Sequence, residues 1–520
     1  MKKIFAIALT LCLMVSALCV MTFTASAEEP TVPAEPAAGV VMRVSALKNG
    51  DSVYYPEKYD FTSFEEGWNA ATELADNSDV MKANDLDRVV VELYANWKAN
   101  TKGEFGDSDG LGFQWSTIYV PGKARMTINM NGHTIDRGLG ENNELDGEVI
   151  CVEKKANLII NDGTITGGNS DNGAGGIHVE DGAHITLNNV KVDGNTVDDD
   201  DGGAIALYNG ATLVMNGGSI SNNISHSFTG CYGTGVYVYG STATFENVTF
   251  QNNQNTYHPE NGTVIYADNY STVKMNKCQV IDNGTYSESQ TKGSISIIEI
   301  TGTSRAEITE TTFRGNGYAA TNCTGLNTLI TVGFHSYLYL DNCTFNANSV
   351  MYLLEANSED MDVVNSSFLN NAANVFYGGP ESNITFTKCT FNNNPASQWT
   401  DYYSFDFLVY REKTAFIDCS FGNSTFNDRD KATFTKTNTD IKDPNESGDK
   451  LSSPSKNDIN RLSSIFGEGS PAMIIAILAL FASVASICLT IVYNKDKMVR
   501  VVANDTEENE DGETDDAKEE

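Results

Sequence analysis

Residues 158–165 read Leu-Ile-Ile-Asn-Asp-Gly-Thr-Ile, residues 185–192 read Ile-Thr-Leu-Asn-Asn-Val-Lys-Val, and residues 213–220 read Leu-Val-Met-Asn-Gly-Gly-Ser-Ile. Each stretch alternates apolar with polar residues and then passes through a turn, which is typical of a short strand with one buried face. The same template begins at eleven positions, namely Met126, Leu158, Ile185, Leu213, Ala243, Val273, Ala306, Leu338, Met361, Ile384 and Ala415. The stretches are therefore repeats of one structural unit.

Successive repeats begin between 23 and 33 residues apart, and each contains a second short apolar strand, as at residues 149–152 and 205–207. Variable spacing is typical of a solenoid whose loops absorb insertions. Because no helical pattern connects the strands, we expect each strand to pair with its equivalent one coil further along. The sequence predicts an all-β fold, a right-handed parallel β-helix of about eleven coils over residues 85–435.

The ends of such a solenoid expose sheet edges, which natural proteins cover. Ser63-Phe-Glu-Glu66 has the spacing of a capping box and opens an amphipathic helix over residues 61–76. Residues 61–84 are therefore predicted to form an N-terminal helical cap, preceded by an N-terminal extension at residues 28–60.

Both termini carry targeting patterns. Residues 1–27 combine two lysines, an apolar run and a small-residue cleavage pattern, which indicates a secretory signal peptide. Residues 471–493 are uncharged, apolar and followed directly by positive charges, which indicates a transmembrane helix with a cytoplasmic C-terminus. A disordered stalk at residues 436–470 and an acidic cytoplasmic tail at residues 494–520 are predicted on either side of this span. The sequence thus predicts a single-pass type I protein of the cell membrane with an extracellular ectodomain.

Five repeats contain the tetrapeptide Phe-x-x-Asn, ending at Asn253, Asn316, Asn348, Asn371 and Asn394. One GGAI tetrapeptide is present at Gly202-Gly203-Ala204-Ile205, and the first repeat contains Met130-Asn-Gly-His-Thr-Ile135. Over residues 85–425 the chain resembles the bacterial surface proteins with polymorphic outer-membrane-type repeats, which carry GGA(I/L/V) and FxxN. The resemblance implies a pectate-lyase-like superfold displayed on a bacterial cell, with an adhesive role. The chain departs from that family in having one GGAI and a predicted anchor helix in place of an autotransporter barrel.

The FxxN motifs and four cysteines point to the interior of the solenoid. The Asn of each motif is predicted to bond to backbone and to its equivalent one coil away, which forms a ladder. Cys278, Cys343, Cys389 and Cys419 share one column of the repeats with small and apolar residues, so we expect buried free thiols. Because only Cys389 and Cys419 fall in consecutive coils, a disulfide between them is the alternative.

The chain is strongly acidic, with 34 Lys+Arg against 69 Asp+Glu and a formal net charge of 34 − 69 = −35. Nucleic acid is excluded as a partner, because a phosphate backbone requires a basic face. Carboxylates gather at Asp171, Asp198, Asp199, Asp200 and Asp201, in corresponding loops of two consecutive coils. Stacked loops would bring them within reach of one calcium ion, the only cofactor that the sequence suggests. A solvated acidic corner is the simpler interpretation.

No residue is assigned a catalytic role by the sequence. Between Lys191 and Lys274 there is no Lys or Arg to act as the base of a lyase. His178 alternates with apolar neighbours and is interpreted as a surface residue. Tyr237, Tyr239 and Tyr266 lie on successive strands, where outward-facing rings suit sugars or protein partners.

The sequence therefore predicts a membrane-anchored surface protein that binds an extracellular glycan or protein, in the manner of an adhesin. The alternative is an enzyme of the pectate-lyase-like superfold, either a calcium-assisted polysaccharide lyase or a glycoside hydrolase. The two differ in whether a strip of the surface holds two or more acids beside a basic residue.

Overall fold

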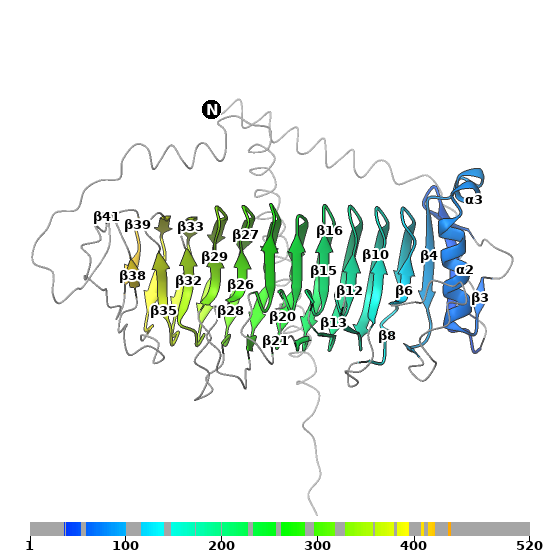
Figure 1. The fold of residues 1–520 in the computed structure, drawn as a ribbon, viewed down its shortest axis with the longest axis horizontal. Coiled ribbons are helices and arrows are strands. Elements are labelled where there is room, and N and C mark those ends of the chain that lie inside the picture. The colour runs from blue at the N-terminus through cyan, green and yellow to red at the C-terminus, as the bar shows by residue number, and fades with distance from the viewer. Residues whose placement is uncertain are drawn as a thin grey trace, which may run out of the picture. The chain divides into compact units, whose positions relative to one another are not determined.

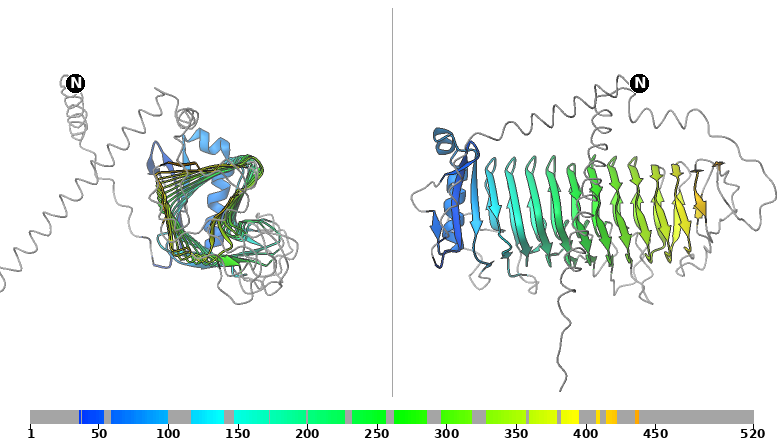
Figure 2. Two further views of the ribbon diagram at one scale, coloured as in Figure 1. Left: turned by 90° about the vertical axis from the view of Figure 1, so that its left-hand side faces the viewer. Right: turned by 180° about the vertical axis from the view of Figure 1, so that it is seen from behind.

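The computed structural model shows three sheets wound into a parallel β-helix, with the strands of each sheet stacked along the solenoid (Figures 1 and 2). The strand pairing confirms the predicted all-β solenoid. The described residues are 36, 38–53, 59–99, 116–139, 147–171, 173–198, 200–226, 232–255, 262–285, 296–317, 328–356, 359–378, 382–394, 407–409, 414–421 and 435–437.

Sheet A is the largest sheet, with 25 strands among these residues. Most coils contribute one strand before a bend and a shorter strand after it. The strands are β1 (Met42–Lys48), β2 (Asp51–Val53), β3 (Asp60–Phe61), β4 (Arg88–Leu93), β5 (Trp97–Lys98), β7 (Arg125–Asn129), β8 (Thr134–Asp136), β10 (Asn157–Thr166), β13 (His184–Asp193), β16 (Thr212–Ser221), β19 (Thr242–Glu246), β20 (Thr249–Gln251), β23 (Thr272–Asn276), β24 (Gln279–Ile281), β27 (Arg305–Thr309), β28 (Thr312–Arg314), β30 (Tyr337–Asp341), β31 (Thr344–Asn346), β33 (Asp360–Val364), β34 (Ser367–Leu369), β36 (Asn383–Thr387), β37 (Thr390–Asn392), β39 (Thr414–Ile417), β40 (Ser420–Phe421) and β41 (Thr435–Thr437).

Sheets B and C complete the coils. The 11 described strands of sheet B are β6 (Ser116–Val120), β9 (Glu148–Val152), β12 (Ile177–Val179), β15 (Ile205–Tyr208), β18 (Val236–Tyr239), β22 (Ile265–Asp268), β26 (Ser296–Ile300), β29 (Thr328–Val332), β32 (Tyr352–Ala356), β35 (Asn374–Gly378) and β38 (Phe407–Val409). Sheet C is short and comprises β11 (Asn169–Ser170), β14 (Thr196–Val197), β17 (Ile224–Ser225), β21 (Gln254–Asn255) and β25 (Gly284–Thr285).

Equivalent residues of successive coils stack on one another in sheet A. Leu158 pairs with Met126 on one side and with Ile185 on the other, and all three side chains are buried. The same register continues to Ile384, as the alternation of apolar residues predicts. Each coil therefore adds one apolar layer to a continuous core.

The predicted register is wrong by one residue in the last repeat. Ile384 pairs with Thr414, and Ala415 pairs with Thr385. Thr414 and Phe416 are the buried residues of β39, while Ala415 is only half-buried. A threonine at a buried position and an alanine at an outward one reverse the usual polarity, so hydrophobicity alone misplaces this strand.

The predicted asparagine ladder is confirmed, and it extends beyond the FxxN motifs. Each side-chain Nδ2 donates to Oδ1 of the next Asn at 2.9–3.2 Å. The same Oδ1 accepts the backbone N–H of the preceding Asn, and Nδ2 also bonds to a carbonyl of the previous coil, as Asn348 does to Phe313 at 3.0 Å. The buried column comprises Asn195, Asn223, Asn253, Asn283, Asn316, Asn348, Asn371 and Asn394.

The residue before each ladder Asn turns the chain. Asn252, Asn370 and Asn393 adopt the left-handed conformation there, each with φ of 55°. Asparagine tolerates this region better than other residues with a side chain, apart from aspartate. Ala347 occupies the same position with φ of 55° and has no such compensation.

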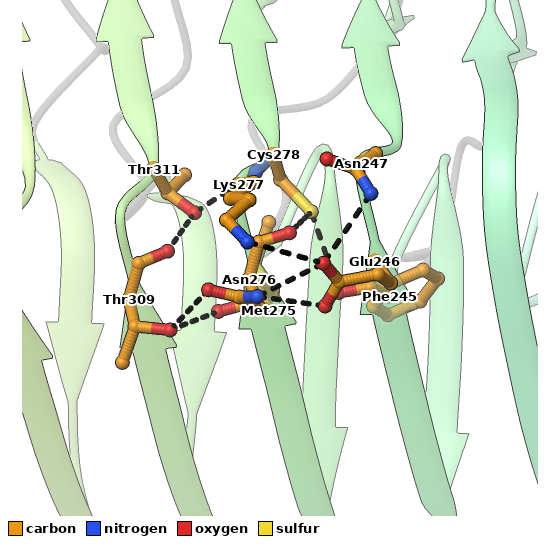
Figure 3. A network of polar contacts seen from close by, with 9 residues as sticks. All are labelled: Phe245, Glu246, Asn247, Met275, Asn276, Lys277, Cys278, Thr309 and Thr311. Atoms are coloured by element: carbon orange, nitrogen blue, oxygen red, sulfur yellow. Dashed lines mark hydrogen bonds and ion pairs between the residues drawn. The ribbon is translucent and has the colours of Figure 1, made fainter. Parts of the chain in front are cut away.

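The four column cysteines are buried and free. Figure 3 shows one of them, Cys278, whose thiol donates to the carbonyls of Phe245 at 3.5 Å and Asn276 at 3.4 Å. In the next coil the hydroxyl of Thr311 takes the same place and donates to the carbonyl of Thr309 at 2.9 Å. The column therefore selects small side chains that can donate a hydrogen bond, which hydrophobicity does not reveal.

The N-terminal helices lie beside β4 at one end of the solenoid (Figure 1). Helix α2 (Phe64–Asp76) begins after Ser63, whose Oγ accepts the N–H of Glu66, and α3 (Ser78–Ala83) follows it. Trp68 and Ala71 of α2 are buried in the same core as the coils. Strand β1 pairs antiparallel with β4 and lies within residues 28–60, where the sequence analysis predicts only an extension.

The predicted signal at residues 1–27, span at 471–493 and tail at 494–520 lie outside the described residues, as does the predicted stalk beyond residue 437. Within the part of the chain that the structure describes, neither helix has the length and apolar character needed to cross a membrane.

Candidate ligand-binding face of sheet B

The outer face of sheet B carries two rows of side chains. In β18 the valines face the core, whereas Tyr237 and Tyr239 belong to a separate cluster outside it. Strand pairing continues the row of Tyr237 through neighbouring coils, so that it comprises His178, Ala206, Tyr237, Tyr266, Glu299, Thr331 and Glu355. The parallel row comprises Tyr208, Tyr239 and Asp268. We call these two rows the sheet B strip.

Four tyrosines form the aromatic part of the sheet B strip. The rings of Tyr237 and Tyr266 stack with centroids 5.9 Å apart and planes 8° apart, and Tyr208 lies 5.6 Å from Tyr237. Tyr237 and Tyr266 are each 8% exposed, whereas Tyr208 and Tyr239 are half-buried. The structure thus brings together the three tyrosines that the sequence singled out. Tyr208 and Tyr239 are the members with more accessible ring surface.

His178 lies at one end of this aromatic cluster. Its ring stacks on Tyr208 at 5.0 Å and lies between two carboxylates, with Nδ1 3.7 Å from Glu148 and Nε2 3.6 Å from Glu180. Its side chain is 16% exposed, so it faces outward as predicted but is more enclosed than a surface residue. Burial lowers the pKa of His178, although the charges of Glu180 and Asp200 oppose this, so the ring is neutral near pH 7.

Glu299 and Glu355 form the acidic part of the sheet B strip, two coils apart in one row. Ser296 donates to Glu299 at 2.9 Å, and Thr328 donates to Glu355 at 2.6 Å. Burial raises the pKa of Glu299 to about 7, and the nearby charges of Glu355 and Asp268 act in the same direction. Thr331 lies between the two acids in the row.

The predicted acidic loop lies beside the tyrosines. Burial, aided by the charge of Asp200, raises the pKa of Asp201 to about 7, although the N–H of Tyr232 and the hydroxyl of Tyr237 bond to its carboxylate. Asp200 accepts the N–H of Gly173 at 2.5 Å and that of Asp201 at 2.7 Å. The loop is therefore built into the border of the sheet B strip.

The calcium site predicted for this loop stays a prediction. Asp198 accepts from Asn169 at 3.2 Å, and Asp171 is exposed. Asp199 lies outside the described residues. Among the residues that are described, no three His, Cys, Asp or Glu side chains converge as metal ligands. The N–H donors around Asp198, Asp200 and Asp201 favour the simpler interpretation of a structured acidic corner.

The sequence analysis missed Glu148, Glu180, Glu299 and Glu355. The local signal was present, because Glu299 stands between Ile298 and Ile300 in a strand whose neighbours are buried. Alternation alone identifies such a residue as outward-facing. It does not show that residues from distant coils share one row with the tyrosines.

Sheet B also lacks basic residues. None of its 11 described strands contains Lys or Arg. Sheet A differs, since Lys274 and Arg305 lie on its strands and Lys274 pairs with Glu307 at 3.7 Å. The two large faces of the solenoid therefore have different chemistry, and only sheet B combines stacked tyrosines with uncompensated acids.

The comparison with protein families agrees with this architecture. The family model described as "Right handed beta helix region" matches residues 117–297 and 289–421. No curated protein and no solved structure is significantly similar to the chain.

Proposed function

Because the chain belongs to the right-handed β-helix family, we propose that it binds an extended extracellular glycan along the sheet B strip, in the manner of an adhesin. The observation that carries this proposal is the cluster of Tyr208, Tyr237, Tyr239 and Tyr266 on three neighbouring strands of one face. Aromatic rings stack on the apolar faces of sugars, and the hydroxyl of tyrosine adds a polar contact.

The geometry of the solenoid favours a linear ligand. Neighbouring coils repeat at about 4.8 Å along the axis, so a row of side chains runs parallel to that axis. The tyrosines continue in the same row into Glu299, Thr331 and Glu355, which extends the face over several coils. A polymer lying along this row would meet aromatic contacts first and polar contacts next. A folded protein partner is the other class of ligand that such a face would suit.

The proposed place of action is the outside of the cell. This rests on the sequence, with its predicted signal at residues 1–27 and predicted membrane helix at residues 471–493. Held by one helix, the solenoid would present the sheet B strip to polymers of the surroundings.

The test measures retention of the full-length protein, in detergent micelles, on immobilised glycans. Tyr208→Ala combined with Tyr239→Ala should reduce retention about tenfold or more, because each removes an accessible ring. The matched control is Tyr339→Ala on the outer face of sheet A, which should leave retention unchanged. Equal retention by the strip variant and the control would contradict the proposed site. Retention of proteins alone would favour the protein ligand.

Glycoside hydrolysis is the second candidate function, and Glu299 and Glu355 favour it. Two coils separate their backbones by about 9.6 Å, close to the carboxyl separation of about 6.5–9.5 Å in inverting glycosidases. The pKa of about 7 for Glu299 suits a general acid. A lyase is less well supported, since no Lys or Arg lies on the described strands of sheet B. New reducing ends that disappear with both Glu299→Gln and Glu355→Gln would establish the hydrolase, and binding without new ends would exclude it for the glycans tested.

A further inference from the structure

We propose that the glycan bound by the sheet B strip is cationic, a linear polymer of amino sugars whose amines are protonated rather than acetylated. This inference rests on the proposed function and names its substrate class. It follows from the charge of the strip, from one buried hydroxyl in it, and from the neighbouring tyrosines.

The charge of the sheet B strip selects against acidic ligands. Glu299, Glu355 and Asp268 lie in the strip itself, and Glu148 and Glu180 flank its His178. No lysine or arginine on the described strands of sheet B offsets them. Uronic acid and sulfated polymers would therefore meet repulsion, whereas a protonated amine gains an ionic hydrogen bond.

A buried hydroxyl in the strip points independently to a hydrogen-bonding ligand. Thr331 is 6% exposed, and its Oγ1 makes no hydrogen bond with any described residue. Strand pairing places Thr331 directly between Glu299 and Glu355. An ammonium group has three donors and no acceptor, so it can bond to a hydroxyl oxygen and to carboxylates at the same time. A neutral sugar hydroxyl can serve only part of this arrangement.

The aromatic part of the strip fits the same ligand. Tyrosine faces attract cations through the ring quadrupole, in addition to stacking on sugar rings. Tyr266 stands next to Glu299 in the row, since Tyr266 and Glu299 are paired residues of adjacent coils. A polymer that lies along the row would thus place sugar faces on the tyrosines and amines on the acids.

The raised pKa values of the strip describe the cost of leaving these acids unpaired. Burial and repulsion by Glu355 and Asp268 raise the pKa of Glu299, and burial with repulsion by Asp200 raises that of Asp201. A bound cation opposes both effects, because it stabilises the ionised carboxylates.

The experiment compares three oligosaccharides of equal length binding to the full-length protein in detergent micelles. The probes are a β-1,4-linked glucosamine oligomer, its fully N-acetylated counterpart, and a galacturonic acid oligomer, with calorimetry at pH 6 as the readout. We expect the glucosamine oligomer to bind at least about tenfold more tightly than the acetylated one at low salt. The difference should shrink about threefold or more in 0.5 M salt, because ionic contacts are screened.

Two variants assign the effect to the sheet B strip. Glu299→Gln with Glu355→Gln should weaken the glucosamine oligomer about tenfold and leave the acetylated oligomer unchanged. Glu307→Gln, an acid on sheet A paired with Lys274, is the matched control and should change neither. Because the net charge of −35 attracts any polycation, poly-lysine is included as a probe. Its binding should not respond to Tyr208→Ala with Tyr239→Ala, whereas glucosamine binding should.

The outcomes separate this inference from the proposed function. Equal binding of the acetylated and free oligomers would overturn the cationic ligand and retain a glycan-binding strip. Tighter binding of the galacturonic acid oligomer would also overturn it. Glucosamine binding that responds to none of the strip variants would show general attraction to the acidic chain and overturn the inference. Binding of none of the three oligomers would contradict the inference and count against the proposed function.

Discussion

Asn253 donates its Nδ2 hydrogen to Oδ1 of Asn283 at 3.0 Å, one coil further along, in a column from which solvent is excluded. The backbone N–H of Asn253 reaches the same oxygen at 3.0 Å. One side-chain oxygen therefore accepts from two buried donors. This geometry makes each ladder residue a link that its neighbours cannot replace.

Asn283→Ala is expected to destabilise the protein by about 3 kcal/mol, because it leaves the Asn253 donors and the carbonyl of Phe250 with unmet hydrogen bonds. Urea unfolding followed by circular dichroism measures the loss. The matched control is Asn216→Ala, which removes an exposed bond to Asn188 and should cost about 0.5 kcal/mol or less. Equal effects would show that the ladder adds nothing beyond surface bonding.

Ala347→Gly is expected to stabilise the protein by up to about 1 kcal/mol, because Ala347 holds φ of 55° where a Cβ is unfavourable. Ala347→Asn should act in the same direction, since Asn252 and Asn370 occupy equivalent positions. Thermal unfolding of the three proteins checks this. A lower melting temperature for both variants would contradict the argument from backbone strain.

The buried thiols should resist alkylation in the folded protein. Burial raises the pKa of Cys278 to about 11 and that of Cys343 to about 12, so neither is a thiolate at pH 8. Treatment with iodoacetamide, followed by peptide mass spectrometry, should label both residues only after unfolding in urea. Rapid labelling of Cys343 without urea would show that the column opens.

Stability should fall as the pH rises from about 4 to about 7, through Glu299 and Asp201. Both have a pKa of about 7 in the folded protein, against about 4 in an unfolded chain. Between these pH values the unfolded chain binds fewer protons, so rising pH favours unfolding by about 1–3 kcal/mol per carboxyl and then has no further effect.

The variant Glu299→Gln isolates one of these two groups. Its unfolding free energy should decline less steeply between pH 4 and 7 than that of the parent protein, and it should be the more stable of the two at pH 8. Melting temperatures at pH 4, 5.5, 7 and 8 provide the comparison. Parallel curves would contradict the raised pKa of Glu299.

Helix α2 provides a test of the proposed cap. Trp68→Ala removes a 2% exposed side chain that belongs to the continuous core and should cost about 3–4 kcal/mol. If α2 protects the first coils from edge pairing, the variant should also self-associate, which analytical ultracentrifugation detects. Destabilisation without association would leave α2 as a core element and not a cap.

The parts of the fold that repeat at every coil were predictable from the sequence. The period-two alternation places Leu158 and Ile185 in one layer, and FxxN places Asn348 behind Phe345, because both patterns span fewer than ten residues and recur. The register failed at Thr414 and Ala415, where residue polarity does not match burial. The hydrogen-bonding role of the cysteine column was also missed, since Cys278, Thr311 and Ser366 share a donor and not a hydropathy.

The sequence by itself determined the solenoid, its buried column of asparagines and the outward direction of Tyr237 and Tyr266, because each depends on side-chain alternation within one strand. Only the tertiary structure decided which outward residues share a row. Glu299 and Glu355 are separated by two coils of different lengths, and they align with Thr331 because variable loops absorb the difference while the backbone hydrogen bonds of β26, β29 and β32 set the register. The composition of the sheet B strip is a property of that register, and no single repeat contains it.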